Sequence, residues 1–156
     1  MPTITSGSPT PVDGRRLRGD ATRQLVLAEA VQMASEKGLS DMSIAQLADA
    51  VHLSKSGIAT LFGSKEALQL AVVEYARTVF VAEVITPCSE VPDGAEKLRA
   101  IGASWLRYSR NRVFRGGCFF LAAAAEFDSR PGAVKQRVAQ CLGSGTTIWR
   151  GVRREL

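Results

Sequence analysis

Apolar residues at helical spacing, interrupted by capping residues, constrain the fold of this chain more strongly than any other feature. Ser43 is a suitable helix N-cap, and Gln46 three residues later completes the pattern of a capping box. The apolar residues that follow fall at the i, i+3, i+4 and i+7 positions of one helix face: Ile44, Leu47, Ala48 and Val51. The pattern predicts a short, half-buried helix directly after Ser43.

A tight break and a second short helix come next. Residues 52–53 interrupt the apolar pattern, and Ser54 is a new N-cap. The brief helix after it carries Ile58 and Phe62 on its inward face. Two short helices around such a turn make a helix-turn-helix, which the sequence places at residues 43–62.

Longer helices flank this motif on both sides. Asp20 is a suitable cap for a helix that runs to Lys37, and Gly38 supplies the left-handed stop. After the motif, Ser64 caps a fourth helix that continues toward Pro87. That helix is long enough to connect two parts of the molecule.

The composition of residues 1–19 predicts a disordered arm. Pro, Gly and Thr dominate it, and its basic cluster consists of Arg15, Arg16 and Arg18. Such a cluster suits a DNA minor groove or a run of phosphates, and it suits a solubilising tail equally well.

The second half of the chain predicts three more helices. One apolar stripe consists of Leu98, Ile101, Trp105 and Leu106. The segment Cys118–Phe127 is apolar on every side until Glu126, so we expect it at the centre of this half. Pro131 begins a last helix, with Val134, Val138, Cys141 and Leu142 facing inward.

These elements predict an all-α protein of two connected parts. Residues 20–80 form a helix-turn-helix head of three helices, which the long fourth helix joins to a helical body at residues 81–156. A chain of 156 residues suits a small head that shares a core with a larger body better than it suits two independent cores.

Composition argues against an enzyme, a metalloprotein and a membrane protein. The three cysteines lie far apart and the chain has a single histidine, so zinc-ligand spacing and a catalytic triad are both lacking. No polar catalytic cluster surrounds Cys118 or Glu126, and no cofactor is implied. No segment reaches the roughly 20 apolar residues of a membrane-spanning helix, and the N-terminus lacks a signal peptide. We therefore expect a cytoplasmic protein without a membrane partner.

The net charge of +5 does not by itself indicate DNA binding, because residues 1–66 carry as many acidic as basic side chains. The placement of individual residues is more informative. A recognition helix that starts at Ser54 would bring its first-turn N–H groups to DNA phosphates, with Lys55 and Ser56 in that turn. Thr60 follows one turn later on the exposed face. The serine would cap a helix in any protein and the lysine suits a solvated surface, so only their joint placement favours contact with double-stranded DNA.

A specific order of caps, breaks and charges recurs along residues 20–80: Gly38, Ser43, Leu47-Ala48, Leu53-Ser54-Lys55-Ser56-Gly57 and Phe62-Gly63-Ser64-Lys65-Glu66-Ala67-Leu68. This order resembles the N-terminal domain of the tetracycline-repressor (TetR) family of bacterial transcriptional regulators. The resemblance implies a homodimeric repressor that a small-molecule effector releases from its operator. It also implies DNA contacts, with Lys65 as a phosphate anchor, from Ser43, Ser54, Lys55, Ser56, Gly57, Thr60 and Lys65.

Two stretches of the second half, Arg115–Phe120 and Glu126–Gly132, resemble the sensor domain of one branch of the same family. The resemblance implies an effector pocket in the body, for which the available aromatic lining is Trp105, Tyr108, Phe119, Phe120 and Phe127. Aromatic residues at helical spacing also serve as plain core. Cys118 is better explained as a small buried hydrophobe than as a thiol sensor.

The sequence departs from the family pattern in three places. His52 stands at a turn position usually held by glycine, and a histidine can adopt a left-handed conformation there at some cost in free energy. Ala59 and Leu61 replace two phosphate-contacting residues of the recognition helix. The chain also ends at Leu156, where the family continues into two helices of the dimer interface. The alternative to a dimeric repressor is therefore a degenerate or truncated relative that binds a small molecule or a partner without specific DNA binding.

Overall fold

The computed structural model describes residues 14–152, with side chains for residues 17–143. Every regular element in that range is helical, which confirms the predicted all-α class. In chain order the elements are α1 (Gly14–Lys37), α2 (Ile44–Ala50), α3 (Lys55–Phe62), α4 (Lys65–Phe80), a π-helical turn η1 (Val81–Ile85), a 3-10 turn η2 (Thr86–Cys88), α5 (Ala95–Arg110), α6 (Phe119–Phe127) and α7 (Ala133–Val152).

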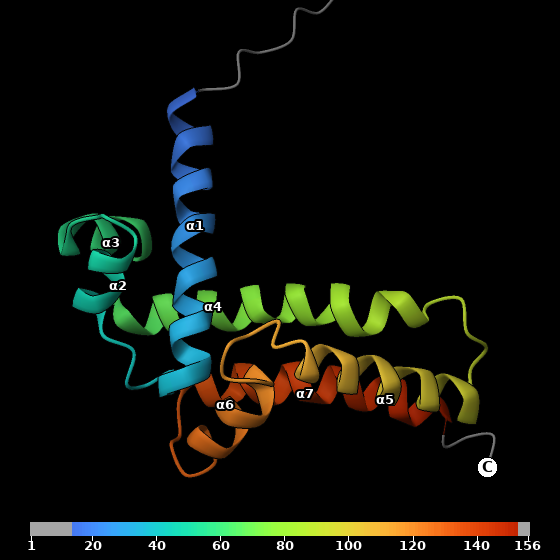
Figure 1. The fold of residues 1–156 in the computed structure, drawn as a ribbon. Coiled ribbons are helices and arrows are strands. Elements are labelled where there is room, and N and C mark those ends of the chain that lie inside the picture. The colour runs from blue at the N-terminus through green and yellow to red at the C-terminus, as the bar shows by residue number, and fades with distance from the viewer. Residues whose placement is uncertain (1–13, 153–156) are drawn as a thin grey trace, which may run out of the picture.

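Helix α4 connects the head to the body (Figure 1). Helix α1 crosses α4 near its start, and α2 and α3 lie beside that crossing. Helix α7 runs alongside α4, and α5 packs against α7 and the η1 and η2 turns that follow α4. Helix α6 lies below the C-terminal end of α1 (Figure 1). The predicted arrangement of a helix-turn-helix head, a long fourth helix and a helical body is confirmed.

All three predicted serine caps form. Each hydroxyl accepts the N–H of the third residue of its helix: Gln46 at 3.4 Å for Ser43, Gly57 at 3.0 Å for Ser54 and Ala67 at 3.0 Å for Ser64. The capping box at Ser43 is only half formed, because the Gln46 side chain accepts a hydrogen bond from Lys37 Nζ at 3.3 Å. The cap itself needs only the serine, so the helix start is unchanged.

Helix α1 begins six residues before the predicted cap Asp20, so the prediction of an arm through residue 19 is wrong for residues 14–19. Three arginines and a leucine form the middle of this stretch, and both residue types are good helix formers. Thr22 Oγ1 also donates to the carbonyl of Arg18 at 2.8 Å, within the continuous helix. The rest of the predicted arm, residues 1–13, lies outside the described residues. At the other end, Gly38 adopts the predicted left-handed stop with φ +96°.

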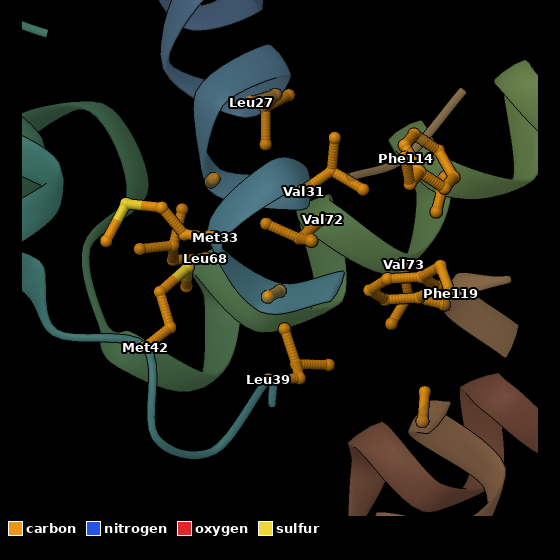
Figure 2. Packing of buried hydrophobic residues seen from close by; sticks show 14 of the residues in the cluster. Leu27, Val31, Met33, Leu39, Met42, Leu68, Val72, Val73, Phe114 and Phe119 are labelled. Atoms are coloured by element: carbon orange, nitrogen blue, oxygen red, sulfur yellow. The ribbon is translucent and has the colours of Figure 1, made fainter. Parts of the chain in front are cut away.

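One apolar core runs from the head into the body. Leu27 and Val31 of α1 pack with Leu68 and Val72 of α4 (Figure 2). The same cluster takes in residues of the α1–α2 loop and of the body, among them Leu39, Met42, Phe114 and Phe119. Helix α4 is therefore part of a core shared by both halves of the molecule.

The prediction that Cys118–Phe127 lies at the centre of the body is wrong. Phe119, Phe120 and Phe127 are buried, but Leu121 is 58% exposed. Apolar composition shows that a helix tolerates burial, but it does not show how many sides its neighbours cover. In α7, Val134 and Val138 face inward as predicted, whereas Leu142 is 42% exposed. No helix of the described chain has the length and hydropathy needed to cross a bilayer.

Candidate nucleic-acid interface

The first turn of α3 is open to solvent. Ser54 caps the helix, and its hydroxyl also shares a hydrogen bond with the Ser56 hydroxyl at 2.9 Å. A Cβ on Gly57 would lie 3.3 Å from Ser54 Oγ, so the glycine leaves room for this cap. Lys55 is exposed and has no hydrogen-bond or ion-pair partner among the described residues. A free ammonium group and the positive end of a helix dipole therefore coincide on the surface.

The second turn of α3 extends this exposed face. Thr60 is exposed, and its Oγ1 donates to the carbonyl of Ser56 at 2.8 Å. Ala59 is exposed beside it, whereas Leu61 is half-buried against the core. The structure thus brings Lys55, Ser56 and Thr60 onto one face.

The turn before α3 has the predicted backbone. His52 adopts φ +55° and its side chain is exposed. The N–H of Leu53 donates to the carbonyl of Ala48 at 2.9 Å, which closes the turn. The predicted left-handed histidine is confirmed, and the motif tolerates it because a few per cent of non-glycine residues adopt this region.

Arg23 of α1 supports the other end of α3, which sequence reasoning missed. Its Nη1 donates to the carbonyl of Leu61 at 2.6 Å, and its guanidinium lies 4.3 Å from the centroid of the Phe62 ring. A cation at a helix C-terminus is favourable because it pairs with the free carbonyls and the negative end of the dipole. The only sequence signal is that Arg23 is the sole basic residue between Asp20 and Lys37.

Lys65 lies at the start of α4, where its exposed ammonium group donates to the carbonyl of Ser40 at 2.7 Å. An ammonium group has three protons, so two remain for a phosphate. Ser43 contributes its hydroxyl to the α2 cap and is half-buried. Lys65 is thus held at a defined position on the surface of the head.

The five predicted pocket residues belong to two environments. Tyr108, Phe119, Phe120 and Phe127 are buried, and Trp105 is half-buried. Edge-to-face contacts connect three of the buried rings, those of Tyr108, Phe119 and Phe120, through Phe80 and Phe114: Phe80–Tyr108 at 5.6 Å, Phe80–Phe120 at 5.8 Å, Tyr108–Phe114 at 5.9 Å, Phe114–Phe119 at 6.2 Å and Phe119–Phe120 at 5.4 Å. This packing is that of a core.

The Tyr108 hydroxyl is the exception within this aromatic core. It is buried without a hydrogen bond, as is the Ser109 hydroxyl. Burial, followed by the neighbouring Cys118, raises the pKa of Tyr108 above its ordinary value. The backbone N–H of Phe119 is close enough to offset this in part, but it does not reach the oxygen with the geometry of a hydrogen bond. The hydroxyl is therefore a neutral, unpaired donor inside the body.

The body also has an open groove of about 420 Å³ on α5, lined by Ala103, Leu106, Arg107, Arg110 and Asn111. None of the five predicted pocket residues lines it. Within the described residues, no three histidine, cysteine or acidic side chains lie close enough to hold a metal ion.

Two family models match the chain. Residues 26–72 match the model described as "Bacterial regulatory proteins, tetR family", and residues 94–152 match "Tetracyclin repressor-like, C-terminal domain". Together the matches span more than half of the sequence. The chain belongs to the tetracycline-repressor family. The helix-turn-helix described above lies within the part of the chain that matches the tetR-family model.

Solved TetR-family structures share its fold. A TetR transcriptional regulator from Chloroflexus aurantiacus J-10-FL is 26% identical, with a TM-score of 0.75 over 82% of this chain and 65% of that one. A TetR-family regulator from Streptomyces coelicolor is 22% identical, with a TM-score of 0.68 over 88% and 68%. AibR, solved in complex with isovaleryl coenzyme A and operator DNA, is 18% identical, with a TM-score of 0.67 over 81% and 67%. This TetR-family chain thus spans about two thirds of the length of these regulators. No curated protein matches the sequence.

Proposed function

We propose that this TetR-family regulator is a sequence-specific repressor that binds operator DNA through residues 20–80 and acts in the cytoplasm. The observation that carries the proposal is the exposed face of α3, on which an unpaired Lys55 accompanies Ser56 and Thr60. Lys65, anchored on Ser40, supplies a phosphate contact at the start of α4. Ser43, Ser54 and Gly57 contribute by holding α2 and α3 in place.

The body, residues 81–156, is the effector-binding and dimerisation part in this proposal. AibR, which has the same fold, carries both isovaleryl coenzyme A and operator DNA in its structure. In the present chain, the unpaired Tyr108 hydroxyl is the donor to which we assign the polar group of an effector. Trp105, Phe119, Phe120 and Phe127 are the apolar residues that we assign to the same effector site, and none of the chain's residues is assigned a catalytic role.

A homodimer is the assembly that fits operator recognition. Two recognition helices related by a two-fold axis contact DNA half-sites about 34–36 Å apart. A small rotation of each head changes the separation of the two helices, so that they no longer match the half-site spacing. An effector that prefers the rotated state by about 1–3 kcal/mol is sufficient to release the DNA.

Selection of duplexes from a random-sequence pool by the purified chain tests this function. We expect one enriched, two-fold symmetric sequence, with an affinity that falls steeply as salt increases. Lys55→Ala and Lys65→Ala should each weaken binding and lower the salt slope by about 1, because each removes one phosphate contact. Lys97→Ala is the matched control, since Lys97 pairs with Asp93 in the body and should leave both quantities unchanged.

The alternative is a relative that senses a small molecule or a partner without specific DNA binding. Ala59 favours this alternative, because it places an apolar methyl group beside Thr60 on the exposed face of α3. A folded chain that enriches no sequence at low salt would support the alternative. A monomeric mass in solution would further exclude the simple dimeric repressor.

A further inference from the structure

The carboxylate of Glu126, on α6 of the body, binds the backbone of the α1–α2 loop in the head. Its two oxygens accept the N–H of Leu39 at 2.8 Å and of Ser40 at 2.7 Å. The side chain is only 17% exposed, and Arg130 lies 4.0 Å away as a weaker, more exposed partner. A carboxylate that accepts two successive backbone N–H groups makes charge-assisted bonds, which are the stronger class of hydrogen bond.

Gly38 permits this close approach. A Cβ at this position would lie 3.3 Å from both oxygens of Glu126, and the backbone has φ +96°. The left-handed glycine therefore ends α1 and leaves space for the carboxylate in the same place.

All three polar groups of Ser40 are bonded to other elements. Its N–H binds Glu126, its hydroxyl accepts from Arg130 Nη1 at 2.5 Å, and its carbonyl accepts from Lys65 Nζ at 2.7 Å. Gln69 of α4 similarly donates to the carbonyl of Leu39 at 3.0 Å. A continuous chain of hydrogen bonds thus runs from α6 through the loop to Lys65.

A second junction between body and head does not reach Lys65. The segment before α6 contacts the side of α1, where Arg115 pairs with Glu29 at 2.8 Å and Glu36 at 3.2 Å. The N–H of Gly116 donates to the hydroxyl of Ser35 at 3.0 Å. This junction holds the two parts together, whereas the Glu126 junction also fixes the carbonyl that orients Lys65.

We propose that Glu126 is a positioning residue for DNA binding: through Ser40 it holds the Lys65 ammonium group where a phosphate contact is made. The proposal rests on the proposed function, because it assigns Lys65 to DNA. A lysine held in advance loses less side-chain freedom on binding than one that must be ordered by the DNA. Because Glu126 lies on α6 of the body, a movement of α6 would be transmitted through Ser40 to Lys65.

Hydrogen exchange of the free chain tests the structural part. Glu126→Gln keeps the side-chain shape but replaces one acceptor with an amide that faces a backbone N–H. We expect at least tenfold faster exchange at Leu39 or Ser40, and unchanged exchange at Gly38, whose N–H binds Ala34. Unchanged exchange at both loop amides would overturn the proposal.

Binding to the duplex selected by the wild-type chain tests the DNA part. We expect Glu126→Gln to bind about 3- to 10-fold more weakly and to add nothing to the loss in Lys65→Ala, because both changes act on one contact. Glu29→Gln, the same chemical change at the other junction, should leave affinity unchanged. Arg130 is exposed, so Arg130→Ala should leave the fold intact. It should lower the affinity for the duplex less than Glu126→Gln does.

The outcomes are separable. Additive losses in Glu126→Gln and Lys65→Ala, or equal losses in Glu126→Gln and Glu29→Gln, would overturn the proposal while DNA binding stands. If the wild-type chain selects no duplex, the proposed function fails and the positioning role fails with it. Non-additive losses confined to Glu126 and Arg130 would support the proposal.

Discussion

Among single residues, Tyr108 is one of two in the described part of the chain, with Ser109, whose buried hydroxyl has no hydrogen-bond partner. It is 2% exposed, and its ring packs edge-to-face on Phe80 and Phe114. Its hydroxyl makes no hydrogen bond, and leaving a buried polar group unpaired costs about 1–3 kcal/mol. Burial of the ring therefore stabilises the core, whereas burial of the unpaired hydroxyl destabilises it. For this reason we assign the hydroxyl to effector binding.

Tyr108→Phe should raise the free energy of unfolding by about 1 kcal/mol, because it removes the unpaired hydroxyl and keeps the ring. Urea unfolding measures this change. Ser104→Ala is the control, since the buried Ser104 hydroxyl accepts from Arg107 at 3.1 Å and its loss should lower stability by about 1 kcal/mol. A destabilised Tyr108→Phe would contradict the unpaired state of the hydroxyl.

The same hydroxyl predicts a stability change in alkali. Burial raises the pKa of Tyr108 in the folded chain above its ordinary value of 10.0. Well below pH 10 the hydroxyl is therefore neutral in the folded and the unfolded chain, and it does not make the free energy of unfolding depend on pH. Above pH 10 the unfolded chain loses the proton first, and stability falls by up to about 1.4 kcal/mol per pH unit. The difference in unfolding free energy between wild type and Tyr108→Phe should therefore grow above pH 10. A constant difference across that range would contradict it.

At the scale of elements, the sequence predicts the features that depend on residues close together in the chain. The caps at Ser43, Ser54 and Ser64 form as predicted, because a cap joins residues only three positions apart. The centre of the body was not predictable, because burial of Leu121 depends on which helices cover α6. The start of α1 was missed because no local signal outweighed the Pro- and Gly-rich stretch before it.

Two substitutions at Ser54 should separate its role as a cap from its place at the DNA interface. Asn and Asp cap as well as Ser, so Ser54→Asn and Ser54→Asp should leave the thermal midpoint within a few degrees of wild type. Only the aspartate adds a negative charge where phosphates approach, and its affinity for the selected duplex should fall at least tenfold. Equal affinity of the two variants would place Ser54 away from the DNA.

At the scale of the whole molecule, contacts between residues more than 80 positions apart join the head to the body. Glu126 with Leu39, Arg115 with Glu29, and Gln32 with the carbonyl of Val113 all belong to this class. Helical periodicity contains no information about such pairs, so the sequence predicted the two parts of the molecule and not how they dock. The candidate DNA-contacting face could be predicted, while the residues that hold it in place could not.

Gly116 tests how tightly the two parts dock. A Cβ there would lie 1.8 Å from the carbonyl oxygen of Ser35, which is backbone and cannot turn aside. Gly116→Ala should therefore lower the free energy of unfolding by about 1–3 kcal/mol or more. Gly102→Ala is the matched control, because a Cβ within α5 meets nothing within 4 Å and should raise stability by about 0.5–1 kcal/mol.

The shape of the unfolding transition carries the second half of this test. Both tryptophans belong to the body, so fluorescence reports the body, while far-UV circular dichroism reports all helices. Because α1 and α4 share one core with the body, the two signals should change together in wild type and in Gly102→Ala. In Gly116→Ala the shared core remains, so the transitions should move to lower urea and still coincide. Separate transitions in the wild-type chain would show that head and body unfold independently, and this would contradict a single cooperative core.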